Sequence, residues 1–324
     1  MTGPGGAGAE VLLANRTLTA VPGIQVGHAL TSDGASGCTV VIGPFRAAVD
    51  ASGLATGSRE LHVLDLEHMV PATTAILFTG GSAFGLAAAD GVTDWLAEHG
   101  LGHDTGVARV PIVPAAVIFD LRPERMRPGP ETGRAACEAA SRAAVPLGRV
   151  GAAASATVGN LGGPQGTMWG GLGSSALTLG EWTVGALAVV NPLGDVLDGQ
   201  GRIVAGARAA DGSFLDSARL LREWPLSELR DGSFRSSVRE GALRPGRNTT
   251  LTLVATDAPL SKVDLLRLAR MAGTALPRRI SPRTARRRRR ACARARSCGA
   301  ARFRRCARGG ADPPSRAARR SRPP

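Results

Sequence analysis

The chain has 324 residues, of which 43% are hydrophobic, so it can bury a substantial core in one large domain or two small ones. Its five cysteines lack the paired spacing of a zinc site or a disulfide framework, and no apolar run reaches the ~18 residues of a membrane span. The formal net charge of +14 arises in residues 283–324, which hold 16 of the 40 basic residues and one of the 26 acidic residues; the rest of the chain is close to neutral, which argues against a nucleic-acid-binding fold.

The N-terminal part predicts a loose leader followed by buried strands. Residues 1–16 are rich in glycine and alanine, and Val11-Leu12-Leu13 is too short an apolar run for a signal peptide. We therefore expect a flexible N-terminus and a soluble, cytoplasmic protein. The first clear strands are predicted at Cys38–Gly43 and Ala75–Phe78, with Ala47–Asp50 as a pairing partner of the first.

The second of these strands runs into a glycine-rich loop, Thr79-Gly80-Gly81-Ser82-Ala83-Phe84-Gly85, and residues 86–98 predict an amphipathic helix. A strand, a glycine loop and a helix in this order are typical of anion or oxyanion sites, because N–H groups at a helix N-terminus are free to donate. The loop has neither the glycine spacing of a nucleophile elbow around Ser82 nor the Lys-Ser/Thr ending of a phosphate-binding loop. We expect Gly80, Gly81 and Ser82 to line the substrate or to bind an oxyanion, with a purely structural turn as the alternative.

The middle of the chain predicts a mixture of strands and one helix. The predicted strands are 110–121, 171–179, 182–191 and 201–205, and the predicted helix is 132–143. Asn191 ends one of these strands, where a side-chain amide can stabilise a developing oxyanion, a contribution of roughly 2.7–4 kcal/mol for one donor. The competing interpretation is that Asn191 is a turn residue before Pro192.

Residues 208–247 are charged and irregular, and they lead to a β-branched run that predicts a buried strand beginning at Thr249. A hydroxyl at the start of a buried strand, directly after Asn248, indicates self-processing. The Thr249 hydroxyl would attack the Asn248 carbonyl to form an ester, and hydrolysis of that ester would leave Thr249 as a new N-terminus whose α-amine can act as the general base. An ordinary loop-to-strand junction and a glycosylation acceptor are the alternatives.

The last predicted element is a helix from Ser261, its cap, through Met271, with an apolar face of Leu265, Leu266, Leu268 and Ala269. Strands do not alternate regularly with helices along the chain. The order of elements therefore predicts an α/β sandwich in preference to a doubly wound parallel sheet.

Several blocks of the sequence resemble one known family. They are residues 21–28 (VPGIQVGH), 79–86 (TGGSAFGL), 112–117 (IVPAAV) and 201–208 (GRIVAGAR), together with the Asn248-Thr249 junction. In this order they resemble the L-aminopeptidase/D-esterase family, which includes β-aminopeptidases and nylon-oligomer hydrolases. The resemblance covers residues 17–282.

The resemblance implies a four-layer αββα sandwich of the N-terminal-nucleophile type, cleaved into chains 1–248 and 249 to the end, and a tetramer of these heterodimers. It implies hydrolysis of a small peptide or amide with a free amine, without a metal or organic cofactor. Thr249 matches the nucleophile, and Asn191 matches the asparagine that holds the oxyanion or orients the nucleophile.

Three positions depart from the family pattern. Many relatives carry lysine after Thr-Val-Gly, where this chain has Asn160, which we expect to line the substrate site. Some have tyrosine where Phe119 stands. After Pro282 relatives continue into a segment with Asp-Gly-Asp, where this chain instead has the five arginines 286–290.

The run of arginines lies in a low-complexity tail, residues 283–324, that is predicted to be disordered. If those arginines are encoded CGA CGG CGA CGC CGT, a shift of one base reads Asp-Gly-Asp-Ala. We therefore predict a frameshift near Pro282, with impaired activity in the chain as written. The alternative is an inactive globular body whose arginine tail binds nucleic acid non-specifically.

Overall fold

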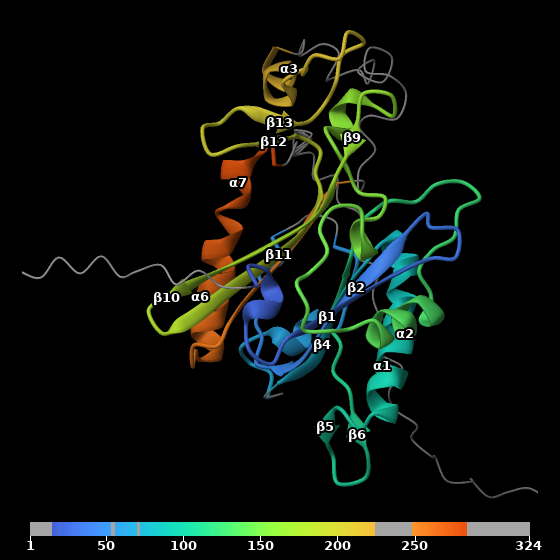
Figure 1. The fold of residues 1–324 in the computed structure, drawn as a ribbon, viewed down its shortest axis with the longest axis vertical. Helices are drawn as coiled ribbons and strands as arrows, with labels where there is room; N and C mark the ends of the chain where they lie inside the picture. Colours follow the sequence, from blue (N-terminus) through green and yellow to red (C-terminus); the bar gives the residue numbers. More distant parts are fainter. Residues whose placement is uncertain (1–14, 53–55, 70–71, 224–247, 284–324) are drawn as a thin grey trace, which may run out of the picture. The chain divides into compact units, whose positions relative to one another are not determined.

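The computed structural model describes residues 15–52, 56–69, 72–223 and 248–283, which belong to one compact unit, residues 1–285 (Figure 1). Residues 1–14 of the predicted flexible leader, residues 224–247 of the irregular connection and residues 284–324 of the arginine tail lie outside the described residues. Two sheets form the centre of this unit.

The first sheet has five strands in the order β1-β2-β4-β7-β3. Their bounds are β1 Gln25–Leu30, β2 Gly37–Phe45, β4 Thr73–Thr79, β7 Ala115–Val117 and β3 Ser58–Arg59. All neighbours are antiparallel except β4 and β7, which run parallel. Because β4 and β7 are parallel, the loops that follow them lie at the same edge of the sheet.

The second sheet has three antiparallel strands in the order β10-β11-β14. Their bounds are β10 Gly171–Leu179, β11 Trp182–Asn191 and β14 Thr249–Thr256. The turn between β10 and β11 has two residues and begins at Gly180, whose φ of +61° lies in the region that favours glycine. Because β11 pairs with β10 on one side and with β14 on the other, the three strands form one continuous ladder, although β14 is far from β11 in the sequence.

Two apolar clusters divide the unit into layers. One cluster lies between the sheets and includes Val41 and Phe78 from the first sheet and Leu187 and Val189 from the second. The other lies between the first sheet and two helices, α1 Ala88–Glu98 and α2 Pro130–Glu138, which pack against each other. In the view of Figure 1, both sheets lie between these helices and a third helix, α6 Lys262–Gly273.

Short elements complete the described chain. The short strands are β5 His103–Asp104, β6 Arg109–Val110, β8 Thr157–Val158, β9 Met168–Trp169, β12 Asp195–Leu197, β13 Ile203–Ala205 and β15 Ile280–Ser281. The remaining α-helices are α3 Ser217–Glu223 and α7 Leu276–Arg279. The 3-10 helices are η1 Leu18–Ala20, η2 Leu61–Leu64, η3 Ser82–Ala87, η4 Gly151–Ala153 and η5 Asn160–Gly162.

Three predicted elements are wrong or misplaced. Residues 47–50 form no strand. The predicted strand 110–121 shrinks to β7 and one end of β6, because Pro111 and Pro114 have no N–H for a ladder. The predicted helix 132–143 begins earlier, at Pro130, and ends at Glu138, because Ser141 exchanges backbone hydrogen bonds with Val26 beside β1.

The predicted apolar face of the last helix is also less buried than expected. Ser261 caps α6 as predicted, since its hydroxyl accepts from the Asp264 N–H. No residue of α6 is fully buried. The predicted face from Leu265 to Ala269 is therefore only half-buried.

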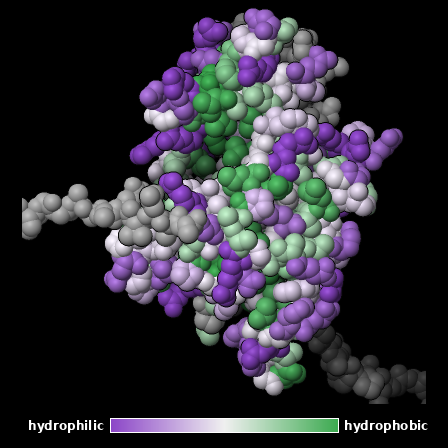
Figure 2. Space-filling view, in the orientation of Figure 1, coloured by the Kyte–Doolittle hydropathy of each residue, from purple (hydrophilic) through white to green (hydrophobic). Residues whose placement is uncertain are grey.

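On the face drawn in Figure 2, hydrophobic residues gather through the middle and hydrophilic residues occupy much of the margin. Within the described residues, no helix is long and apolar enough to cross a membrane.

Candidate active site at the end of the two sheets

The strand register places Thr249 beside Asn191. They are directly opposite each other as the last pair of the β11–β14 ladder. Opposed residues of an antiparallel pair point to the same face, with Cβ atoms about 4.5–5.5 Å apart. Because side chains alternate along a strand, this is the face of Leu187 and Val189, which is packed between the sheets. Thr249 and Asn191 thus lie at the end of the inter-sheet core.

The Asn191 amide is held in one orientation. Its Oδ1 accepts from the Thr157 backbone N–H at 2.9 Å and from the Thr157 hydroxyl at 3.4 Å. Its Nδ2 donates to the Phe119 carbonyl at 3.3 Å. The side chain is only 1% exposed, so these bonds form out of solvent. Because the backbone N–H of Thr157 fixes the amide oxygen of Asn191 on one side, the amide nitrogen must point to the other side.

Asn160 joins the same network. Its Oδ1 accepts from the Thr157 hydroxyl at 2.7 Å, and its Nδ2 donates to the carbonyls of Pro192 at 2.9 Å and Thr157 at 3.3 Å. Sequence reasoning missed Thr157, which connects the two asparagines. The structure therefore brings Asn160, Asn191 and Thr249 together.

The glycine loop after β4 uses its backbone N–H groups inside the fold. Gly80 donates to the Gly37 carbonyl at 2.9 Å and Ser82 to the Ile118 carbonyl at 3.0 Å. Gly81 donates to Asp120 Oδ1 at 2.6 Å. The loop is tightly bent, with φ of 76° at Gly81 and 52° at Ser82. Its shape is thus fixed, and its three N–H groups already have acceptors.

Asp120 is a second residue that sequence reasoning missed. Its Oδ2 accepts from the Ser36 hydroxyl at 2.7 Å. Burial raises the pKa of Asp120 above its ordinary value, although the hydrogen bonds from Gly81 and Ser36 oppose this effect. A Cβ at Gly80 would lie 2.1 Å from Ser36 Oγ and 2.5 Å from Asp120 Oδ2, so only glycine fits. Asp120 follows Phe119, and it therefore ties the glycine loop to the carbonyl that Asn191 contacts.

Other nucleophiles and metals fit this part of the fold less well. Cys38 and Cys137 are buried, and burial raises the pKa of both thiols, to about 12 for Cys137, so neither forms a thiolate readily. Among the described residues, no group of three or more His, Cys, Asp and Glu could hold a metal ion. The sheet register instead places the Thr249 side chain opposite the Asn191 amide.

Comparison with solved structures defines the class of protein. The L-aminopeptidase D-Ala-esterase/amidase of Ochrobactrum anthropi, described as a variant of the N-terminal-nucleophile (Ntn) hydrolase fold, superposes with a TM-score of 0.53 at 17% identity, covering 82% of this chain and 70% of that one. The described chain thus has a mixed α/β fold of the Ntn-hydrolase kind.

Sequence comparison identifies the family. The model of Peptidase family S58 matches residues 16–287, and the chain belongs to that family. An uncharacterized aminopeptidase of Mycobacterium leprae is 39% identical over 280 residues, 82% of this chain and 74% of the relative. A 6-aminohexanoate-oligomer endohydrolase of Paenarthrobacter ureafaciens is 33% identical over 265 residues, 81% of this chain and 69% of the relative. The protein is a peptidase or amide hydrolase, and the predicted family is confirmed.

Proposed function

We propose that this protein is a self-processing Ntn hydrolase that cleaves small peptides or amides bearing a free amine. The observation that carries the proposal is the pairing of Thr249 with Asn191 at the buried end of the inter-sheet core. Thr249 is the nucleophile, and Asn191 is the amide donor for the oxyanion.

Self-processing begins with attack of the Thr249 hydroxyl on the Asn248 carbonyl. The C–N bond breaks, the hydroxyl proton passes to the departing amine, and an ester joins Asn248 to Thr249 Oγ. Water then hydrolyses the ester, leaving a carboxylate on Asn248 and a free α-amine on Thr249. Holding the hydroxyl against the carbonyl can lower the activation free energy by roughly 7–11 kcal/mol. Only the folded sheets hold the two groups in this way.

Substrate hydrolysis repeats these steps on an external amide. The Thr249 α-amine takes the hydroxyl proton, the oxygen attacks the substrate carbonyl, and Asn191 Nδ2 donates to the developing oxyanion. Because the N–H groups of Gly80, Gly81 and Ser82 have internal acceptors, we assign this loop a lining role. Asn160 holds Thr157, and through it Asn191, in place.

The architecture in this proposal is a four-layer αββα sandwich, with α6 as the fourth layer. It is cleaved into residues 1–248 and 249 to the end, and two-chain units of this kind assemble into a tetramer.

The test is intact-mass analysis of the purified protein and of Thr249→Ala, Thr249→Ser and Thr250→Ala. Thr250 pairs with Val190, and its side chain points to the opposite face of the sheet, so Thr250→Ala is a matched control. We expect slow or incomplete cleavage before residue 249 in the chain as written and in Thr250→Ala, some cleavage in Thr249→Ser, and none in Thr249→Ala or in denaturant; restoring the frame after Pro282 should speed cleavage. A repaired-frame protein that is folded, yet remains a single chain with no new N-terminal threonine, would refute the proposal.

A further inference from the structure

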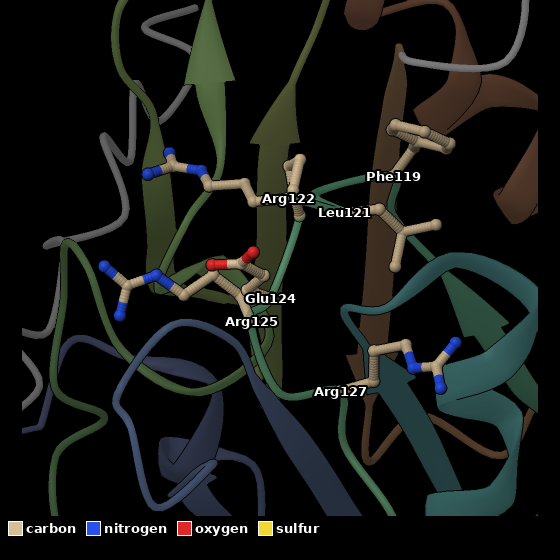
Figure 3. Close-up of a pocket in the computed structure, with 7 residues that line it drawn as sticks. Phe119, Leu121, Arg122, Glu124, Arg125 and Arg127 are labelled. Atoms are coloured by element: carbon tan, nitrogen blue, oxygen red, sulfur yellow. The ribbon is translucent and has the colours of Figure 1, made fainter.

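A pocket of about 540 Å³ adjoins the candidate active site (Figure 3). Seven residues of one segment line it: Phe119, Leu121, Arg122, Pro123, Glu124, Arg125 and Arg127. Its first lining residue is Phe119, whose carbonyl accepts the hydrogen bond from Asn191 Nδ2. The volume is within the range of small-ligand sites, roughly 300–1,000 Å³. A substrate whose scissile carbonyl lies at Thr249 and Asn191 can therefore extend into this pocket.

The lining is rich in arginine. Arg122 and Arg125 point to one side of the segment in Figure 3, with Glu124 between them, and Arg127 points to the other side. Arg125 lies 4.0 Å from Asp33 Oδ2. Arg122 has no carboxylate within 4.0 Å among the described residues, which leaves its charge without a direct partner.

Arg149, whose Nε donates to the Ala154 carbonyl at 3.0 Å, shares an aromatic ring with Arg122. The Arg122 guanidinium carbon lies 5.2 Å from the centroid of the Trp169 ring, and that of Arg149 lies 3.7 Å from the same centroid. Within the described part of the chain, no carboxylate lies within 4.0 Å of either. The ring attracts each cation, and the two positive charges repel each other. An anion that contacts both guanidinium groups would offset that repulsion.

This arginine pair is tied to the active site by two routes. Arg122 is three residues after Phe119, a span of at most about 10 Å. Trp169 is directly opposite Thr157 in the β8–β9 pair, and Thr157 donates to Asn191 Oδ1. The first route reaches Asn191 Nδ2 through the Phe119 carbonyl, and the second reaches Asn191 Oδ1 through Thr157. The arginine pair and the proposed oxyanion donor are therefore held at a fixed separation.

We propose that Arg122 and Arg149, stacked on Trp169, bind a carboxylate of the substrate, and that the enzyme prefers amides whose leaving portion ends in a free carboxylate within about 10 Å of the scissile carbonyl. Guanidinium groups suit this role because their paired N–H donors match the two oxygens of a carboxylate. The inference rests on the proposed function and narrows its substrate to short peptides or amides with a free C-terminus.

The test compares tripeptides that end in Ala-Ala with the same tripeptides carrying a C-terminal amide, the first residue being the one that a screen of α-, β- and D-aminoacyl amides selects. We expect kcat/KM to favour the free carboxylate about tenfold in the wild type, as a partly exposed hydrogen bond to a charged group allows. In Arg122→Gln and in Arg149→Gln this preference should fall to about one, mainly through KM. Arg134→Gln is the control, because Arg134 pairs with Glu98 on the outer helices and should keep the preference.

Calorimetric titration with alanylalanine and with alanylalaninamide measures the same discrimination without turnover. Tighter binding of the free acid by the wild type, lost in both variants, supports the inference even if no self-cleavage occurs and the proposed function fails. Equal treatment of acid and amide by the wild type, or variants that weaken both ligands alike, would overturn the inference while leaving the hydrolase proposal intact.

Discussion

Replacing Asn191 with alanine separates a catalytic role of this side chain from a purely structural one. The substitution removes the amide that Thr157 and Phe119 hold in place and leaves the Thr157 N–H and the Phe119 carbonyl without this partner. A lost oxyanion donor lowers kcat by roughly 10²–10³-fold. The Thr157 N–H loses its acceptor, and a polar group left unpaired costs about 1–3 kcal/mol, so the fold should also lose about that much stability.

The stability loss needs a control on the same strand. Leu187 is 1% exposed, lies on the same face of β11 and belongs to the inter-sheet core, and Leu187→Ala should cost about 2–5 kcal/mol. We expect Leu187→Ala, once folded, to cleave itself and to turn over substrate within a few-fold of the wild type. Asn191→Ala should do both at least about 10²-fold more slowly.

The assays are guanidinium unfolding for the folded fraction, intact mass for the rate of self-cleavage, and hydrolysis of an aminoacyl amide for kcat. Rates are compared per folded molecule. The reasoning is refuted if folded Asn191→Ala works at the wild-type rate, or if Leu187→Ala loses as much activity as Asn191→Ala.

Three further predictions concern pH, the glycine loop and the gene. Burial lowers the pKa of His28 from 6.5 to about 4, so the contribution of the neutral imidazole to the free energy of unfolding is fully present above pH 6.5 and falls by about 3 kcal/mol as the pH drops towards 4. Guanidinium unfolding of His28→Gln should lack this part of the pH dependence, and an unchanged dependence would exclude His28 as its source. Gly80→Ala must displace Ser36 or Asp120, so it should lower stability by about 1–3 kcal/mol and should also slow amide hydrolysis. Gly173→Ala, whose Cβ would meet nothing within 4 Å, should leave hydrolysis unchanged, and equal hydrolysis by the two variants would contradict this role of the loop. Resequencing the genomic locus should reveal one inserted or missing base near the codons for residues 273–286, and a confirmed frame would refute the frameshift.

The parts of the site that lie on regular strands were predictable from the sequence. Alternation and β-branching place β11 at Trp182–Asn191 and begin β14 at Thr249, as predicted. These signals are local, since each depends on the period of side chains along one segment. The Ser261 cap is local in the same way, because it lies three residues from the N–H that it binds.

The supporting residues could not be found in this way, because their partners are distant in the chain. Ser36 binds a carboxylate 84 residues later, and Asn191 binds a carbonyl 72 residues earlier. No periodicity links Thr157 to Asn191 or Trp169 to two arginines. The same limit explains the error at α6, whose apolar face follows from its sequence while its burial depends on neighbours that the sequence of the helix does not name.

The chemistry of the proposed nucleophile depends on the packing of the strands that carry it. Side chains alternate between the two faces of a strand, so a slip of β14 by one residue would point Thr250 instead of Thr249 towards the core, opposite a β11 that β10 holds in place. Such a slip would also move Leu251 and Leu253 from the inter-sheet core to the opposite face, which costs hydrophobic free energy. The apolar residues of β11 and β14 thus fix the register, and the register decides which of two adjacent threonine hydroxyls faces Asn191.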